Sequence, residues 1–326
     1  MHKLPSSSET HARLDESAET VENARTSIDA VTRSLCPACS HPVTPAIRAH
    51  ERQFGQPGNF SYGRCPECQA LVLLNPPADL GAYYSGSYYS FSGELPARSL
   101  KRRFIGLVSG NLGAVVRWVP DKRSRILDVG CGSGHLVQEL AARGYENVEG
   151  IDPFLDESKP LNSRVKLRRA CIEEVSTRYD AILYNHVLEH VADPLAELAA
   201  ATERLSPGGK IIIRVPLADS FLFRSAQANW YQLDAPRHLW IPSRAAVKTL
   251  VAQLGLRLVK IQEDATVAAR LFSYLLAKND RLPPGLMRKY KSPLYAPLIL
   301  WSHLQTAFAR LCKKGDQACF VVEKPQ

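Results

Sequence analysis

Ile126-Leu127-Asp128-Val129-Gly130-Cys131-Gly132-Ser133-Gly134-His135 is the stretch that decides the fold of this chain. Its first residues have strand character, three glycines follow at alternate positions, and an apolar helical pattern begins at Leu136. The stretch therefore predicts a strand, a tight turn and a helix. Glycines at such a turn let backbone N–H groups approach a ligand, and a helix N-terminus favours a carboxylate or phosphate.

The spacing of the glycines separates two classes of nucleotide-like ligand. The dinucleotide fingerprint G-x-G-x-x-G has its third glycine one residue later, where this chain has His135, so an NAD site is disfavoured. The stretch resembles motif I of class I S-adenosylmethionine (SAM) methyltransferases, in which an acidic residue precedes G-x-G-x-G by two positions. The resemblance implies cofactor contacts by Asp128, Gly130, Gly132 and Gly134.

Further segments occur in the order of the same family. Residues 147–152 read as a second strand that ends in an acid about 20 residues past the glycines, as a ribose ligand requires, so Asp152 is the ribose candidate and Pro153 its neighbour in the site. Residues 179–194 look like the family's fourth-strand motif, and 205–210 look like its turn into strand five. The resemblance covers about 125–264 plus a last strand at 315–325, and implies an α/β, Rossmann-like, seven-stranded sheet whose last strand is antiparallel.

Three more cofactor contacts are implied by the resemblance. Cys171 and Ile172 follow strand three, where the family contacts adenine, usually with an acidic residue; Glu173 or backbone groups are the substitutes here. Asn185, at the end of strand four, is expected to contact the methionine portion of SAM.

Two matched C-P-x-C pairs near the N-terminus predict a metal site. Cys36, Cys39, Cys65 and Cys68 have the spacing of a tetrahedral four-cysteine zinc site. Two disulfides or four unrelated thiols are the alternatives, which a reducing compartment and the duplicated motif disfavour. Four thiolates leave no open position, so the zinc is expected to be structural and to fold a small ribbon.

The composition is that of an ordinary soluble protein, with 326 residues, 45% hydrophobic residues and 22% charged residues. Residues 1–33 lack the apolar core of a secretory signal and predict a disordered tail, and no apolar run is long enough for a membrane span, so we expect a cytoplasmic protein. The expected organisation is the tail, a zinc ribbon at 34–75, a Tyr-rich linker and helix at 76–124, and the methyltransferase domain at 125–326.

Residues 83–91 form the Tyr-rich cluster, and 101–119 have helical periodicity. The cluster is either an interdomain packing linker or a segment over the cofactor. The arrangement looks like a subfamily of bacterial methyltransferases in which a four-cysteine ribbon precedes a Tyr-rich segment that folds over the SAM site.

The acceptor side is expected in residues 216–240, a long insertion after strand five. Within it, residues 232–240 resemble the substrate-side loop of the small-molecule branch, in which a histidine lies near the methyl acceptor. His238 is therefore the candidate base and His186 the second candidate, because histidine titrates near neutral pH. His190 carries no metal signature in the sequence.

A basic segment lies within a helical insertion expected at about 266–314. Residues 281–314 contain seven lysines and arginines and no acid, interleaved with aromatic and aliphatic residues, in a chain of net charge +9. This composition fits a helical cap with a solvated basic edge, a peripheral membrane contact or a surface for an acidic partner.

Three classes of function follow. The first is a SAM-dependent methyltransferase acting on a small-molecule, glycan-type or other sugar-containing acceptor. The second is an RNA methyltransferase that uses the ribbon and the basic insertion to bind nucleic acid, although strand four lacks the N/D-P-P-Y tetrad and the insertion matches no RNA-binding module. The third is a non-catalytic scaffold that binds SAM and zinc.

Overall fold

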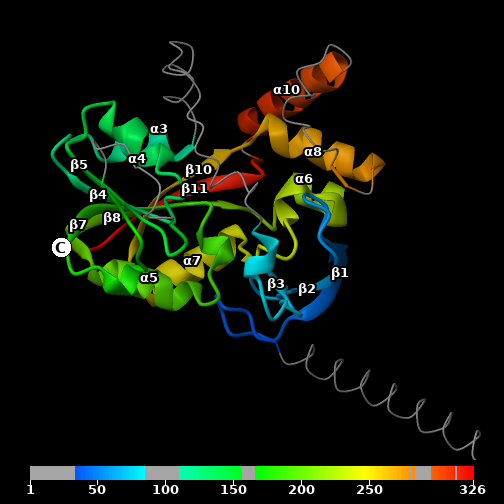
Figure 1. The fold of residues 1–326 in the computed structure, drawn as a ribbon, viewed down its shortest axis with the longest axis horizontal. Helices are drawn as coiled ribbons and strands as arrows, with labels where there is room; N and C mark the ends of the chain where they lie inside the picture. The colour runs from blue at the N-terminus through cyan, green and yellow to red at the C-terminus, as the bar shows by residue number, and fades with distance from the viewer. Residues whose placement is uncertain (1–33, 85–109, 156–165, 280, 283–294, 313) are drawn as a thin grey trace, which may run out of the picture.

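The computed structural model describes residues 34–84, 110–155, 166–279, 281–282, 295–312 and 314–326. Its main sheet has seven strands in the order β10-β11-β8-β7-β4-β5-β6 (Figure 1). In chain order they are β4 (Arg125–Val129), β5 (Asn147–Ile151), β6 (Lys166–Arg168), β7 (Tyr179–Asn185), β8 (Leu205–Pro216), β10 (Arg257–Asp264) and β11 (Gln317–Glu323). The strands from β8 to β6 are parallel, and β11 is antiparallel to both of its neighbours. The predicted Rossmann-like sheet with an antiparallel last strand is confirmed.

Helices cover both faces of this sheet (Figure 1). One face is covered by α3 (Gly110–Trp118) and α4 (His135–Ala141), the other by α5 (Pro194–Glu203) and α7 (Arg244–Gln253). Successive residues of β4 point to opposite faces, so Ile126 packs with α3 and α4 while Leu127 packs with α5 and α7. A strand buried on both faces reads as a nearly continuous apolar run, and among the four buried residues of β4 Asp128 is the polar exception.

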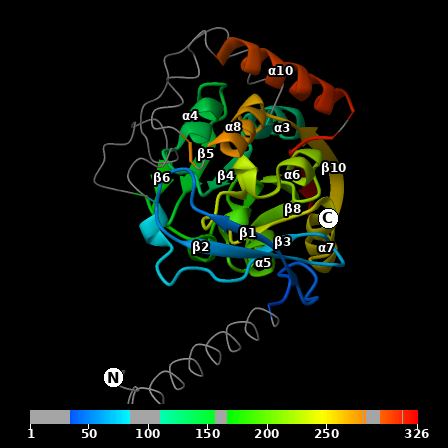
Figure 2. The same ribbon diagram turned by 90° about the vertical axis from the view of Figure 1, so that its right-hand side faces the viewer.

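A smaller antiparallel sheet has the order β1-β2-β3-β9. Its strands are β1 (Thr44–His50), β2 (Asn59–Arg64), β3 (Leu71–Leu73) and β9 (Trp240–Ile241). The first three lie in the cysteine-rich segment, but β9 comes from the end of the insertion after β8. The ribbon sheet therefore continues into the insertion after β8, and Figure 2 shows β1, β2 and β3 lying across that side of the molecule.

The ribbon shares its hydrophobic core with the rest of the chain. Phe60, Tyr62 and Leu71 pack with Phe223 and Trp230 of the insertion. Near the cysteines, Gln253 of α7 donates to the carbonyl of Ala38 at 2.7 Å. These contacts hold a segment that would be too small to form a core alone.

Among the described residues the other helices are α6 (Phe221–Ala226), α8 (Val267–Lys278) and α10 (Ala296–Leu311), with single 3₁₀ turns such as 188–190 and 231–233. The helix expected at 101–119 is present as α3, and its first nine residues lie outside the described part of the chain. The described part of the chain also leaves out residues 1–33, most of the Tyr-rich cluster, and Arg288, Lys289, Lys291 and Lys313 of the basic segment.

The turn expected at residues 205–210 differs from the structure. Strand β8 begins at Leu205, and its pairing with β7 jumps from Tyr179–Leu205 to Ala181–Lys210. Gly208 has a φ of +70° within this bulge, and Lys324 beyond β11 exchanges backbone hydrogen bonds with Gly208 and Gly209. The glycines therefore make a bulge inside a strand, because pairing partners were available on that side.

Candidate functional site

The glycine turn joins β4 to α4. Gly130 has a φ of +65° and Gly134 a φ of +75°, conformations that residues with a Cβ rarely adopt. A Cβ built on Gly130 would lie 2.5 Å from Val187, and one on Gly134 would lie 2.4 Å from Leu167. Both glycines are therefore required by the backbone conformation and by close packing.

Asp152 lies against this turn. One of its carboxylate oxygens accepts from the backbone N–H of Gly132 at 2.9 Å, and the other accepts from Phe154 N–H at 2.8 Å. Asp128 is buried nearby; burial first, and then the charge of Asp152, raise its pKa to about 8. Two carboxyl groups thus share one sheet edge, a costly arrangement without a ligand that carries donors or positive charge.

The other expected cofactor residues lie at the ends of neighbouring strands. Asn185 ends β7, and its buried side-chain oxygen has no hydrogen-bond partner. Pro153 is exposed after β5, and Cys171 is exposed at the start of a 3₁₀ turn. The side chain of Ile172 is buried in the core. Buried polar atoms normally have a hydrogen-bond partner, so the unpartnered amide oxygen of Asn185 fits a site whose ligand supplies a hydrogen-bond donor.

The four cysteines form a compact cluster. Cys36 Sγ lies 3.4 Å from Cys68 Sγ, and Cys39 Sγ lies 3.5 Å from Cys65 Sγ. Tetrahedral zinc bonds of about 2.3 Å place sulfurs about 3.8 Å apart, so the cluster has nearly the size that zinc needs. All four ligand atoms lie within 4.8 Å of one another.

Glu189 is the residue that sequence reasoning missed at the acceptor side. It lies fully buried in the 3₁₀ turn after β7, and His186 Nδ1 donates to its Oε1 at 3.1 Å. Burial alone would raise its pKa, but the hydrogen bond from His186 and the charges of the surrounding histidines lower it to about 2. Its Oε2 has no hydrogen-bond partner. Glu189 is therefore an ionised carboxylate with one oxygen hydrogen-bonded and the other without a partner, and it lies near His186, His190 and His238.

His238 lies beside this carboxylate although it is 49 residues away in sequence. Its Nδ1 donates to the carbonyl of Gln232 at 2.9 Å, which leaves the lone pair on Nε2. Nε2 lies 4.0 Å from Glu189 and 3.9 Å from Asp234. Burial and the neighbouring His190 lower the pKa of His238 to about 4, so the imidazole is neutral near pH 7.

His186 adopts a φ of +57°, a strained conformation for a residue with a Cβ, at the point where β7 ends. The His190 ring stands edge-on to that of His238, with centroids 4.6 Å apart. His190 Nδ1 lies 2.9 Å from both the hydroxyl of Tyr84 and the carbonyl of Arg237. The first tyrosines of the Tyr-rich cluster thus reach the acceptor side.

Glu189, His190 and His238 also bring potential metal-ligand atoms within 4.8 Å of one another, a grouping that the sequence did not reveal. Tetrahedral zinc ligands at 2.0–2.1 Å would lie about 3.4 Å apart. The 4.0 Å between His238 Nε2 and Glu189 is wider. The cluster therefore fits proton acceptance and hydrogen bonding to a ligand better than metal binding.

The ribbon holds the His238 loop in place. Tyr62 of β2 donates to the carbonyl of His238 at 2.8 Å, and Arg237 is fully buried between Asp234 and Glu51. Leu239 N–H donates to the carbonyl of Glu189. The candidate base is thus fixed by residues from two separate parts of the chain.

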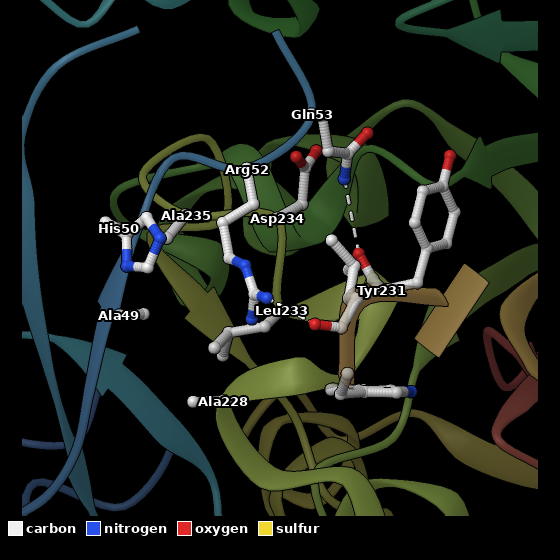
Figure 3. A pocket seen from close by; sticks show the side chains of 11 residues that line it. Ala49, His50, Arg52, Gln53, Ala228, Tyr231, Leu233, Asp234 and Ala235 are labelled. Carbon is white, nitrogen blue, oxygen red and sulfur yellow. Dashed lines mark hydrogen bonds between the residues drawn. The ribbon is translucent and has the colours of Figure 1, made fainter. Parts of the chain in front are cut away.

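A small hollow lies on the other side of this loop (Figure 3). It lies between β1, the 227–235 segment and α8, and its lining includes His50, Arg52, Tyr231 and Asp234. Arg52 donates to Asn229 at 2.6 Å and to backbone carbonyls of Leu276 and Asn279, so its charge is already engaged. The hollow is away from the glycine turn, and we assign it no ligand.

Comparison with known proteins gives the family. Residues 100–261 match the profile of a methyltransferase domain. The chain carries a class I methyltransferase domain. Within the part of the chain that the structure describes, no helix has the length and apolar character to cross a membrane.

Relatives of this methyltransferase domain include enzymes of quinone biosynthesis. The ubiquinone biosynthesis O-methyltransferase of Alkalilimnicola ehrlichii is 34% identical over 131 residues, which is 36% of this chain and 53% of the relative. That of Dechloromonas aromatica is 36% identical over 103 residues, 27% of this chain and 43% of the relative. The match spans about half the length of these relatives.

A solved SAM-dependent methyltransferase from Archaeoglobus fulgidus is 19% identical with a TM-score of 0.44, covering 68% of this chain and 94% of that one. The fold of the methyltransferase domain follows from its strand order.

Proposed function

We propose that this protein is a SAM-dependent methyltransferase acting on the hydroxyl or acidic carbon of a small-molecule acceptor. The observation that carries the proposal is the convergence of the glycine turn, Asp152 and the His238–Glu189 pair at the carboxyl ends of β4, β5 and β7. Open α/β sheets bind ligands along this edge. The O-methyltransferase relatives support a small-molecule acceptor.

In this proposal the cofactor lies over the glycine turn. Asp152 accepts from the ribose hydroxyls, Asn185 accepts from the methionine portion, and the buried carboxyl of Asp128 lies beneath the turn. The Cys171–Ile172 backbone and Pro153 border the adenine side. When bound, SAM supplies a methyl group on a positively charged sulfur, so the residues have only to position the acceptor and take its proton.

His238 takes that proton at Nε2. The carbonyl of Gln232 holds the ring in the tautomer that leaves Nε2 free. Asp234 and Glu189, each about 4 Å away, favour the imidazolium once it has formed. Glu189 also holds His186, the second candidate, whose role is to accept or orient the acceptor hydroxyl.

The four cysteines hold a structural zinc ion in the same proposal. Zinc bound by four thiolates has no position left for substrate, so it does not act on the acceptor. Its effect is indirect, because the ribbon that it folds carries Tyr62 and Glu51 against the His238 loop.

Calorimetry with SAM and with its demethylated product tests the cofactor site. We expect micromolar binding of SAM, and Asp152→Ala should weaken it by about 1–3 kcal/mol because hydrogen bonds to the ribose are lost. Asp121→Ala removes an exposed carboxylate in a distant turn and should leave SAM affinity unchanged. Tighter binding of NADH than of SAM would exclude the proposed cofactor.

A further inference from the structure

Helix α10 has its large apolar side chains on the outside. Its five largest exposed side chains are each 57–82% exposed, namely Leu300, Trp301, Leu304, Phe308 and Leu311. At about 100° per residue these positions fall within an arc of about 100° on one side of the helix. We define this set of five residues as the α10 apolar face.

The other side of the helix faces α8. Ser302, Thr306 and Ala309 are buried there, and Leu298 and Ile299 near the start of α10 pack against the apolar side chains of α8. A surface helix normally turns its apolar stripe toward the core and its polar side toward water. Helix α10 packs Leu298 and Ile299 on α8 but also carries the α10 apolar face on its solvent side, and that face needs a partner other than the core of the domain.

The charge of the surrounding segment selects among partners. Residues 281–314 carry seven basic side chains and no acidic one. A second copy of the same segment would bring like charges together, which disfavours a symmetric contact. An anionic lipid surface attracts the basic groups and accepts the apolar ones, and tryptophan is favoured at the boundary between headgroups and acyl chains.

The dimensions of α10 agree with a helix that lies on a bilayer. Its 16 residues correspond to about 24 Å, too short to span one. Figures 1 and 2 show α10 at the periphery of the molecule, outside α8 and away from the ribbon. Helix α10 therefore lies outside the main sheet, and the side chains of its apolar face are exposed.

We propose that the α10 apolar face docks the protein on anionic phospholipid membranes. Docking buries the apolar face among the acyl chains while basic residues such as Lys314, just beyond the helix, meet the headgroups. It also places the enzyme where lipid-soluble small molecules are concentrated.

Co-sedimentation of the full chain with vesicles tests this docking. We expect binding to vesicles that mix phosphatidylglycerol with phosphatidylcholine, weak binding to phosphatidylcholine alone, and a loss of binding at high salt. The triple variant Trp301→Ser, Leu304→Ser and Phe308→Ser should lose at least about tenfold in affinity for the mixed vesicles, because apolar burial is lost. These side chains are exposed, so SAM calorimetry should show that the triple variant remains folded.

Leu35→Ser is the matched control, because Leu35 is an exposed leucine on the ribbon. It should bind the mixed vesicles like the unmodified protein. Equal vesicle binding by the triple variant, or no binding by the unmodified chain, would overturn the proposal. Sedimentation of the lipid-free protein as a dimer that the triple variant converts to a monomer would overturn it as well, and would assign the face to a second copy.

Discussion

His238 combines a fixed tautomer with deep burial. A neutral imidazole is already in the state that accepts a proton, because its pKa of about 4 lies far below neutral pH. The carboxylates of Glu189 and Asp234 cannot protonate it near neutral pH, but they stabilise the cation that proton transfer creates. Burial and His190 thus keep the resting ring neutral by lowering its pKa, while the two carboxylates act in the opposite direction and stabilise the imidazolium that forms.

His238→Ala should lower kcat by about 10²–10⁴ and leave SAM affinity nearly unchanged, the size expected for loss of a general base. In the unmodified enzyme the acid limb of kcat should lie near pH 4, because only below that pH is His238 protonated. Steady-state kinetics across pH measures both effects. His303→Ala, on the exposed side of α10, is the control. Unchanged kcat in His238→Ala at saturating acceptor would move the role to His186.

Burial makes the charge of Asp128 costly in the folded protein. Its pKa rises from 3.8 to about 8 in the folded state, so the unfolded chain binds fewer protons between these values and stability falls as pH rises through them. Asp128→Asn should therefore raise the free energy of unfolding by about 1–3 kcal/mol at pH 8 and by little at pH 4, while weakening SAM binding. Urea denaturation at both pH values measures the effect. A variant that is destabilised at pH 8 would show that the carboxylate is not strained.

The residues of the glycine turn could be found from sequence because their signals are local. Gly130, Gly134 and Asp152 lie on one strand-turn-helix-strand unit with a characteristic spacing. Glu189, Arg237 and Tyr62 have no such signal, because each acts through a partner that is far away in sequence. Glu189 lies beside His238, Arg237 pairs with Glu51, and Tyr62 donates to the carbonyl of His238. Only the fold shows that His238 lies between two carboxylates.

At the scale of elements, the main sheet was predictable and its connection to the ribbon was not. Alternating strand and helix patterns define a parallel sheet, and the last strand, expected at 315–325, was placed by the resemblance. Strand β9 has only two residues, too short for any periodicity. Its register with Leu71 and Val72 depends on the tertiary packing of the insertion.

The bulge in β8 is a second feature that local sequence did not predict. A Ser-Pro-Gly-Gly sequence predicts a turn on local grounds. In the structure β7 and the segment after β11 flank it, so residues 205–210 remain within the strand. Neighbouring strands thus override the local preference, as they commonly do in sheets.

At the scale of the whole molecule, the ribbon and the methyltransferase domain are joined at the acceptor side. Strand β9 extends the ribbon sheet directly from the His238 loop, and Trp240 of β9 donates to the carbonyl of Leu188 beside Glu189. Arg237 and Tyr62 add two further links. The cofactor turn, in contrast, has its contacts within the main sheet.

Because the ribbon, among the described residues, contacts the His238 loop and not the glycine turn, loss of a zinc ligand should affect the loop more than the cofactor site. Cys65→Ser should release protection from hydrogen exchange in residues 34–75 and also in 232–241, because the loop depends on the ribbon for its pairing. Methyl transfer should fall while SAM affinity, measured by calorimetry, stays within about twofold. Elemental analysis should find about one zinc per unmodified chain and less in the variant.

Cys312→Ser is the matched control, since Cys312 is exposed just after α10 and far from the cluster in sequence. It should retain the zinc, the exchange protection and the activity. If residues 232–241 stayed protected in Cys65→Ser while 34–75 loosened, the His238 loop would be held by α7 and the turn at Glu189 alone. The four-stranded sheet makes the opposite outcome the expected one, because strand β9 has Leu71 and Val72 of the ribbon as its pairing partners.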